Sequence, residues 1–419
     1  NDTYPLWYAQ EVEGVRPDIR IINNSLLGID WYINQLRSTV NESPAIDVLF
    51  TPEQIESGNR EVLYYTGDKP NPAGPYYNLM DVLKEVAKPA IDPRTKRDVG
   101  TQNFPVANLG VPVDRNVVRA NGTVGPKDSI ISPMMFSIPE RTLQRGVYRS
   151  DLIILSIIAT NQWKRPIYFT SPYGELGFWH YLRKDGLAYR LVPVIDLQEN
   201  NKWVLDRSIN AIEGRLGGNI LGSQINRVNI DSAYSNMISK FGFGNANKKG
   251  VYLDDENRRH MLNIRSLFGE VAGMLADRGN IDEAKKLLEK AEAGISTENL
   301  PYGMTSRFNA HNLTGLLYLE AAYKAKMPEL AEKIRVSVRK DLEQQDAYFK
   351  YIQENKPDLY GNFQGLEVTV NAILLETLGA IEKAYDPKTQ AQPPIIPNER
   401  QDSLIINNPL DTGNKGTPK

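Results

Sequence analysis

The strongest constraint in this sequence is a helical hydrophobic period that begins at Asp254 and continues to about residue 385. Apolar residues in this region recur three and four positions apart, which places them on one face of each helix. Asp254 suits the first capping position, and Gly279 and Asn280 form a turn between the first two helices. The pattern predicts five helices, over residues 255–277, 281–295, 309–324, 328–348 and 364–385. Residues 251–385 are therefore expected to form an all-α domain.

The spacing within the first helix pair resembles a tetratricopeptide unit. The matching positions are Phe268, Val271, Ala272, Leu275, Gly279, Ala284, Leu288 and Ala291. Ala331 stands in the second pair where Ala284 stands in the first, so the period is 47 residues rather than the usual value of about 34. We expect tetratricopeptide-like repeats, in which the first helix of each pair lines a concave groove for a partner. The candidate groove residues are Arg265, Asn309, Asn312 and Tyr318, unless the groove packs against the N-terminal domain.

The N-terminal half is predicted to form a small, mostly parallel α/β layer over residues 1–205. The opening stretch indicates a helix over residues 4–13, a buried strand at residues 19–22 and a second helix. Further elements are predicted as strand 61–66, helix 77–87, helix 151–163, strand 165–170, helix 175–183 and strand 187–195. The last three follow β-α-β spacing, which favours parallel strands.

Three other segments lack a clear period. Residues 88–148 are interpreted as a long irregular insertion in the α/β domain, residues 206–250 as a Gly-rich connecting region, and residues 386–419 as an extended or disordered tail. The helix over residues 4–13 has no earlier strand from which to cross over. We therefore expect the chain to be a fragment of a longer protein, with the partner strand upstream of Asn1.

Composition and charge exclude several classes of protein. The 49 Lys and Arg residues against 51 Asp and Glu residues leave no broad cationic field for nucleic acid. The most apolar segment, residues 152–159, is too short to cross a bilayer, so we expect a soluble fragment. The absence of cysteine removes disulfides and thiolate chemistry.

No catalytic residue, metal site or cofactor is predicted. The three histidines, His180, His260 and His311, lie on separate predicted helices, and no two stand at ligand spacing. The GGxxxG sequence of residues 217–222 lies outside any strand-to-helix junction, and the acidic run of residues 254–256 suits helix capping. No pair of acids stands out as it would in a carboxylate-dependent glycosidase.

Two clusters of polar and aromatic side chains are the candidate ligand sites. Both follow predicted strands, and ligands of open α/β layers bind beyond the carboxyl ends of the strands. Amides and hydroxyls beside aromatic faces suit a weakly charged polar ligand such as a sugar. The first cluster comprises Asn23, Asn24, Ser25, Asp30, Trp31 and Tyr32, and the second comprises Thr170, Ser171, Tyr173 and Trp179. The alternative is that the Asn and Ser residues cap helices and the aromatic residues fill the core.

Four stretches of the chain resemble a large bacterial integral-membrane family. They are NDTYPLWYAQEVEGVRPDIRIINNSLL at 1–27, NQWKRPIYF at 161–169, LRKDGLAYRLVPV at 182–194 and VYLDDENRRHMLNIRSLFGEVAGML at 251–275. These stretches are similar to the soluble C-terminal half of that family, whose multi-span N-terminal half resembles protein O-mannosyltransferases. The resemblance implies a polyprenyl-phosphate-sugar-dependent glycosyltransferase for the whole protein, with its catalytic carboxylate in the missing membrane half. It implies no catalytic residue in this chain.

Two functions of different classes follow from these observations. The first is a non-catalytic, periplasmic module of a membrane-embedded glycosyltransferase-like protein, which adjoins the missing membrane half and positions a glycan, peptide or protein acceptor. The second is a stand-alone helical-repeat scaffold for protein interactions. Several apolar spans upstream of Asn1 would favour the first function.

Overall fold

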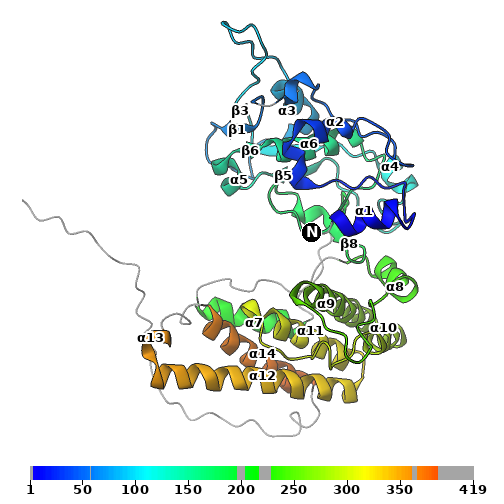
Figure 1. The fold of residues 1–419 in the computed structure, drawn as a ribbon, viewed down its shortest axis with the longest axis vertical. Coiled ribbons are helices and arrows are strands. Elements are labelled where there is room, and N and C mark those ends of the chain that lie inside the picture. The colour runs from blue at the N-terminus through cyan, green and yellow to red at the C-terminus, as the bar shows by residue number, and fades with distance from the viewer. Residues whose placement is uncertain (1–2, 57, 196–202, 217–227, 361–365, 386–419) are drawn as a thin grey trace, which may run out of the picture.

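A computed structural model describes residues 3–56, 58–195, 203–216, 228–360 and 366–385. The described elements gather around two hydrophobic cores. One core contains buried residues from Leu27 to Val194, and the other contains buried residues from Trp203 to Ile381. Figure 1 shows an α/β part in blue to green and a helical part in green to orange. The chain is thus a mixed α/β structure with small sheets and a C-terminal helical region.

The opening stretch forms helices without a strand between them. α1 (Thr3–Glu11) is followed by the 3-10 helix η1 (Asn24–Gly28) and by α2 (Asp30–Gln35). The strand predicted at residues 19–22 is wrong. Ile19 is 43% exposed, and its carbonyl accepts a hydrogen bond from Gln10 Nε2 at 2.8 Å. Because a side chain takes a backbone group that a neighbouring strand would need, the segment follows the surface as irregular chain.

The α/β part contains three small sheets of mixed direction. Their strands are β1 (Val62–Tyr65), β2 (Tyr77–Asn78), β3 (Asn103–Phe104), β4 (Asn108–Val111), β5 (Met134–Ser137), β6 (Val147–Tyr148), β7 (Tyr168–Phe169), β8 (Leu182–Lys184) and β9 (Tyr189–Leu191). The strand orders are β3-β1-β6, β2-β4-β5 and β7-β9-β8. Among these described strands only β1–β3 and β2–β4 pair in parallel, so the predicted mostly parallel layer is wrong. Of these strand pairs, only β8 and β9 are joined by a short connection, residues 185–188, whereas β1 pairs with the much later β6.

Residues 88–148 belong to the α/β core and are not an irregular insertion. They contain β3 to β6, together with α4 (Arg115–Ala120) and α5 (Glu140–Arg145). β4 is buried along its whole length and pairs with β5, with Leu109 opposite Phe136. Strands of two to four residues carry too few side chains to show alternation, which is why the sequence pattern missed them.

α6 (Arg149–Asn161) is the most deeply buried helix of the α/β part. α3 (Leu79–Val86) packs beside it, and the predictions of helices at 77–87 and 151–163 are confirmed. The guanidinium of Arg149 donates hydrogen bonds to Gly28 O at 3.0 Å and to Asn59 O at 2.6 Å. It thereby ties α6 to η1 and to the loop after the 3-10 helix η2 (Glu53–Ile55).

The β-α-β unit predicted over residues 165–195 is wrong. β7, β9 and β8 form an antiparallel sheet, and the predicted helix is replaced by a short 3-10 turn, η3 (Trp179–Tyr181). Gly177 explains the difference: its φ is +85°, and a Cβ there would lie 1.9 Å from Ser137 O at the end of β5. The chain passes so close to β5 at this point that it cannot continue as a helix.

The helical part agrees with the period read from the sequence. Its elements are α7 (Val204–Leu216), α8 (Ile230–Ser239), α9 (Asp255–Asp277), α10 (Ile281–Gly294), η5 (Arg307–Asn309), α11 (Ala310–Lys324), α12 (Pro328–Asn355), α13 (Pro357–Tyr360) and α14 (Glu367–Tyr385). The five predicted helices are confirmed as α9, α10, α11, α12 and α14. Asp254 caps α9 as predicted, because its side chain accepts a hydrogen bond from Asn257 N at 2.8 Å. α9 packs on α10 and α11, and α11 packs on α12.

The predicted Gly-rich connecting region contributes two helices, α7 and α8, to the helical core. Trp203, directly before α7, lies against Gly273 of α9, where a Cβ would be 2.2 Å from the indole. The carboxylate of Glu320 accepts hydrogen bonds from Val204 N and Leu205 N at 2.7 and 2.8 Å, and so caps α7. These contacts come from distant residues, which the local glycine content does not reveal. The glycines of residues 217–222 and the tail at 386–419 lie outside the described residues.

A buried ion pair joins the α/β part to the helical part. Lys184 Nζ of β8 lies 3.1 Å from Glu270 Oε2 of α9, and both side chains are almost inaccessible to solvent. Asn229 N, next to the start of α8, donates a hydrogen bond to Lys184 O at 2.9 Å. Because a buried charge is costly without its partner, this pair fixes the β7-β9-β8 sheet against α9.

Replacing each of two glycines by alanine tests the packing of the helical part. Gly273→Ala should destabilise the fold by roughly 1–3 kcal/mol, because the added methyl group overlaps the buried Trp203 indole. Gly379→Ala, in α14, should stabilise it by roughly 0.5–1 kcal/mol, because the Cβ position there is open and alanine favours helix. Denaturant unfolding measures both changes. A Gly273→Ala variant as stable as the unsubstituted chain would contradict the packing of Trp203 described above.

Candidate functional site

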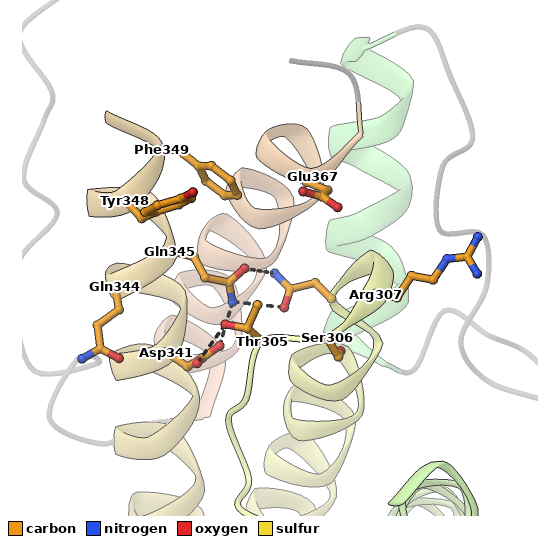
Figure 2. Close-up of a pocket in the computed structure, with 10 residues that line it drawn as sticks. Thr305, Ser306, Arg307, Asp341, Gln344, Gln345, Tyr348, Phe349 and Glu367 are labelled. Atoms are coloured by element: carbon orange, nitrogen blue, oxygen red, sulfur yellow. Dashed lines mark hydrogen bonds between the residues drawn. The ribbon is translucent and has the colours of Figure 1, made fainter. Parts of the chain in front are cut away.

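A pocket of about 550 Å³ opens at one end of the helical part, between η5, α12 and the start of α14 (Figure 2). Its lining comes from three segments that are far apart in the sequence. The lining residues are Thr305, Ser306, Arg307, Asn309, Asp341, Gln344, Gln345, Tyr348, Phe349 and Glu367. Amide, hydroxyl and carboxylate groups therefore border the same space as two aromatic rings, while the Arg307 and Gln344 side chains point away from it in Figure 2.

A left-handed backbone turn places Asn309 at this pocket. Phe308 and Asn309 both have a φ of +52°, a region that contacts of the Cβ atom disfavour. Asn tolerates this region better than most residues, whereas a bulky residue such as Phe does not. Such backbone costs on the order of 1–3 kcal/mol per residue and is found mainly at binding and catalytic sites. Eight other non-Gly residues of the described ranges also have a positive φ, so the turn indicates a binding role only together with the pocket that it lines.

Asn309 is the centre of a hydrogen-bonded polar network. Asn309 Nδ2 donates to Gln345 Oε1 at 3.1 Å, and Gln345 Nε2 donates back to Asn309 Oδ1 at 3.2 Å. Gln345 Nε2 also donates to Asp341 Oδ2 at 2.7 Å. Asn312 Nδ2 donates to both Asn309 Oδ1 and Asp341 Oδ2, at 2.7 and 2.6 Å. These amide donors hold the Asp341 carboxylate at the wall of the pocket (Figure 2).

Aromatic and charged side chains complete the pocket. Tyr348 is 49% exposed and Phe349 is buried, and both rings lie above Gln345 in Figure 2. Arg307 and Glu367 add charges of opposite sign. Amide and carboxylate oxygens beside an exposed aromatic ring can bind the hydroxyl groups and the apolar face of a sugar. An anionic ligand fits less well, because the Asp341 carboxylate would repel it.

The first predicted ligand cluster lies at the start of η1 and α2. Asn23 caps η1, and its Oδ1 accepts a hydrogen bond from Ser25 N at 2.9 Å. Tyr32 is buried, and its hydroxyl accepts a hydrogen bond from Asn23 N at 2.8 Å. Asp30 accepts a hydrogen bond from Trp31 N, while the Trp31 ring is 58% exposed. Capping and core packing account for Asn23, Asp30 and Tyr32, and ligand binding by this cluster stays a prediction.

The two predicted clusters meet at Tyr173. Its hydroxyl donates to Asp151 Oδ1 at 2.9 Å, and the Asn24 side chain lies within hydrogen-bonding reach of it. Burial, together with the Asp151 charge, raises the pKa of Tyr173, so the phenol stays protonated. Phe169 and Phe178 stack against its ring. The other members of the second cluster are exposed: Thr170, Ser171 and Trp179.

The four predicted groove residues are buried. Arg265 is 2% exposed and donates hydrogen bonds to two backbone carbonyls of the segment before α11. Tyr318 is inaccessible to solvent, and its hydroxyl donates to Glu292 Oε1 at 3.0 Å. The predicted placement on an open groove is wrong for Arg265, Asn312 and Tyr318, because these side chains satisfy buried polar groups between the helices. Of the four, Asn309 alone lines the pocket.

The α12 side of the pocket is not among the site residues predicted from the sequence. Asp341, Gln345 and Tyr348 follow one another at spacings of four and three residues, which puts them on one face of the helix. This spacing is the signal that would have revealed them. The spacing alone does not predict a binding site, because a polar face on a long helix ordinarily meets solvent.

Comparison with known proteins gives one family match. Residues 1–209 match the family model described as TMEM260-associated domain 2. The N-terminal part of the chain is thus similar to this domain family, which is consistent with a TMEM260-like family. The match ends within α7 and so does not include the pocket. No curated protein and no solved structure matches the chain.

Among the described residues, none of the helices combines the length and the apolar content that a bilayer span requires. The same residues contain no group of three or more His, Asp or Glu side chains that could hold a metal ion. The three histidines lie on separate elements, His180 in η3, His260 in α9 and His311 in α11.

His311 makes the stability of the helical part depend on pH. The side chain is buried behind the pocket, with Nε2 at 2.6 Å from Pro301 O. Burial lowers the pKa of this imidazole below its usual 6.5, and the Arg265 charge acts in the same direction. The unfolded chain therefore binds a proton that the folded chain does not, so stability should fall as the pH drops below about 6.5. The chain should therefore be less stable at about pH 5.5 than at about pH 7.5.

Urea unfolding at about pH 7.5 and about pH 5.5 measures this loss. His311→Gln should remove most of the difference between the two conditions, because glutamine does not titrate. His260→Gln is the matched control, since His260 is a partly exposed residue of α9. An equal pH dependence in the His311→Gln variant and the unsubstituted chain would show that another group is responsible.

Proposed function

We propose that this chain is a non-catalytic module of a membrane-embedded glycosyltransferase-like protein, and that it binds a glycan or glycosylated acceptor in the pocket at Asn309. The observation that carries the proposal is the left-handed turn at Phe308 and Asn309. This turn brings an amide into a network with Asp341 and Gln345, beside the exposed ring of Tyr348. Strain of this kind persists only when the surrounding structure enforces it, and it clusters at binding and catalytic sites.

The proposal extends to the protein of which this chain would be a part. We place the module on the periplasmic side of a bacterial membrane, next to a membrane half that carries the catalytic carboxylate and uses a polyprenyl-phosphate sugar. Two observations support this placement. Four stretches resemble a family whose membrane half is similar to protein O-mannosyltransferases, and residues 1–209 match TMEM260-associated domain 2. The helical part would then hold the acceptor for the membrane half.

The alternative function is a stand-alone helical-repeat scaffold for protein interactions. It is favoured by two helix pairs, α9–α10 and α11–α12, that are joined by short turns and pack on each other. Ala284 and Ala331 are both buried at corresponding places, as tetratricopeptide-like repeats require. The burial of Arg265 and Tyr318 argues against it, because these residues would line the groove of such an array.

Saccharide binding tests the pocket directly. A panel of methyl glycosides and short oligosaccharides, including methyl α-mannoside, is screened by saturation-transfer NMR. Tyr348→Ala should raise the Kd of the best-binding saccharide about tenfold, because it removes the ring that a sugar face contacts. Tyr351→Ala is the matched control: it lies on the same helix, is 54% exposed and does not line the pocket. Equal weakening by both variants, or no binding anywhere in the panel, would overturn the glycan proposal.

The non-catalytic part of the proposal has its own test. Incubation of the chain with a polyprenyl-phosphate sugar and peptide acceptors should give neither transfer nor hydrolysis, because no nucleophile and base were found together in the sequence. Radiolabelled sugar makes any product visible. Turnover that a single substitution within residues 1–200 abolishes would show that the chain is an enzyme.

A further inference from the structure

The segment between α3 and β3, residues 88–100, forms a closed loop that we call the basic hairpin. Ile91 and Asp98 pair across it as an antiparallel bridge. Asp92 N donates a hydrogen bond to Arg97 O at 2.9 Å, just beyond this bridge. The two arms are thus held together up to the tip, so the tip residues have a defined arrangement on the surface.

The base of the basic hairpin is anchored by buried polar contacts. Asp98 Oδ1 accepts hydrogen bonds from Ala90 N at 2.8 Å and from Gly100 N at 2.9 Å. The buried guanidinium of Arg60 lies 3.4 Å from Asp98 Oδ2 and donates to Lys88 O at 2.9 Å. These contacts connect both arms to the α/β core. The loop therefore does not need a partner to order it.

The tip combines cations with exposed apolar side chains. Arg94, Lys96 and Arg97 are all exposed, and none of them forms an ion pair with a carboxylate in the described ranges of the chain. Ile91 is 53% exposed and Val99 is 46% exposed, one on each arm. Three unpaired cations within four residues stand out in a chain whose total charge is close to balance.

The nearest acidic group at the tip does not neutralise this cluster. The Asp92 carboxylate is turned toward the backbone of the loop, where its Oδ1 accepts hydrogen bonds from Arg94 N at 2.6 Å and Thr95 N at 2.9 Å. These backbone donors lower the pKa of Asp92, so it keeps its charge and its place in the turn. The guanidinium and ammonium groups remain directed to solvent.

We propose that the basic hairpin docks on the anionic headgroups of a lipid membrane. Each cation near such a surface gains attraction from the negative surface potential, and exposed aliphatic side chains gain by entering the boundary of the acyl region. The two kinds of residue occur together here, on a loop that is already ordered. A nucleic acid or a soluble phosphorylated partner would use the cations and leave Ile91 and Val99 in water.

Vesicle co-sedimentation of the whole chain tests this proposal. The chain should bind vesicles of phosphatidylcholine with added phosphatidylglycerol, and it should bind phosphatidylcholine alone far more weakly. Binding should fall as salt is added, because salt screens the attraction. The triple variant Arg94→Glu, Lys96→Glu, Arg97→Glu should weaken partitioning about a hundredfold or more, since three attractive charges become repulsive. No preference for the anionic vesicles in the unsubstituted chain would overturn the proposal.

Two further variants distinguish membrane binding by the basic hairpin from binding that depends only on the net charge of the chain. Lys248→Glu, Lys249→Glu, Lys286→Glu makes the same change of charge at exposed positions of the helical part and should leave partitioning within about twofold. Ile91→Ser, Val99→Ser should weaken partitioning about tenfold while keeping the preference for anionic lipid. An equal loss in the two triple variants would overturn the proposal. Unchanged partitioning of the serine variant, with tight binding to duplex DNA or a phosphopeptide instead, would do so as well.

Discussion

The buried carboxylate of Glu320 connects the helices on which the pocket depends. It lies on α11, caps the first N–H groups of α7 at Val204 and Leu205, and accepts a hydrogen bond from Tyr385 OH of α14 at 2.9 Å. Lys324 Nζ lies 3.7 Å away on the same helix. A carboxylate buried without such partners would be strongly unfavourable, so α7, α11 and α14 have to meet here. Asn309, directly before α11, then lies against the Asn371 side chain of α14.

That frame explains how the left-handed turn at Phe308 and Asn309 persists. The Asn309 side chain is bound from α12 by Gln345 and from α14 by Asn371, whose Oδ1 accepts a hydrogen bond from Asn309 Nδ2 at 3.3 Å. Asn312 of α11 also donates a hydrogen bond to Asn309 Oδ1. Several independent contacts therefore outweigh a local backbone cost of a few kcal/mol. A site built in this way is already in its binding arrangement, which reduces the entropy lost when a ligand binds.

The sequence predicted the long helices well and the sheets poorly. α9 begins and ends at the predicted residues, since its caps and its apolar face are all local signals. The strands, of two to four residues, carry too little pattern, and neither the direction nor the partner of any strand could be predicted. Asn309 is the only lining residue of the pocket that was among the predicted site residues. It was predicted there as part of a groove between helical repeats. Asp341, Gln345 and Tyr348 looked like an ordinary solvent face until the η5 turn was seen to lie opposite them.

What the sequence by itself determined is the all-α character of the C-terminal half and the place of each long helix in it, because spacings of three and four residues are contained within one helix. The tertiary structure alone decided the mixed strand directions, the inclusion of α7 in the helical core and the existence of the pocket. Each of these rests on contact between residues far apart in the chain: Gly177 with Ser137, Trp203 with Gly273, and Asn309 with Gln345. No local pattern encodes such a contact, because its free energy arises when both partners have been brought together by the rest of the fold.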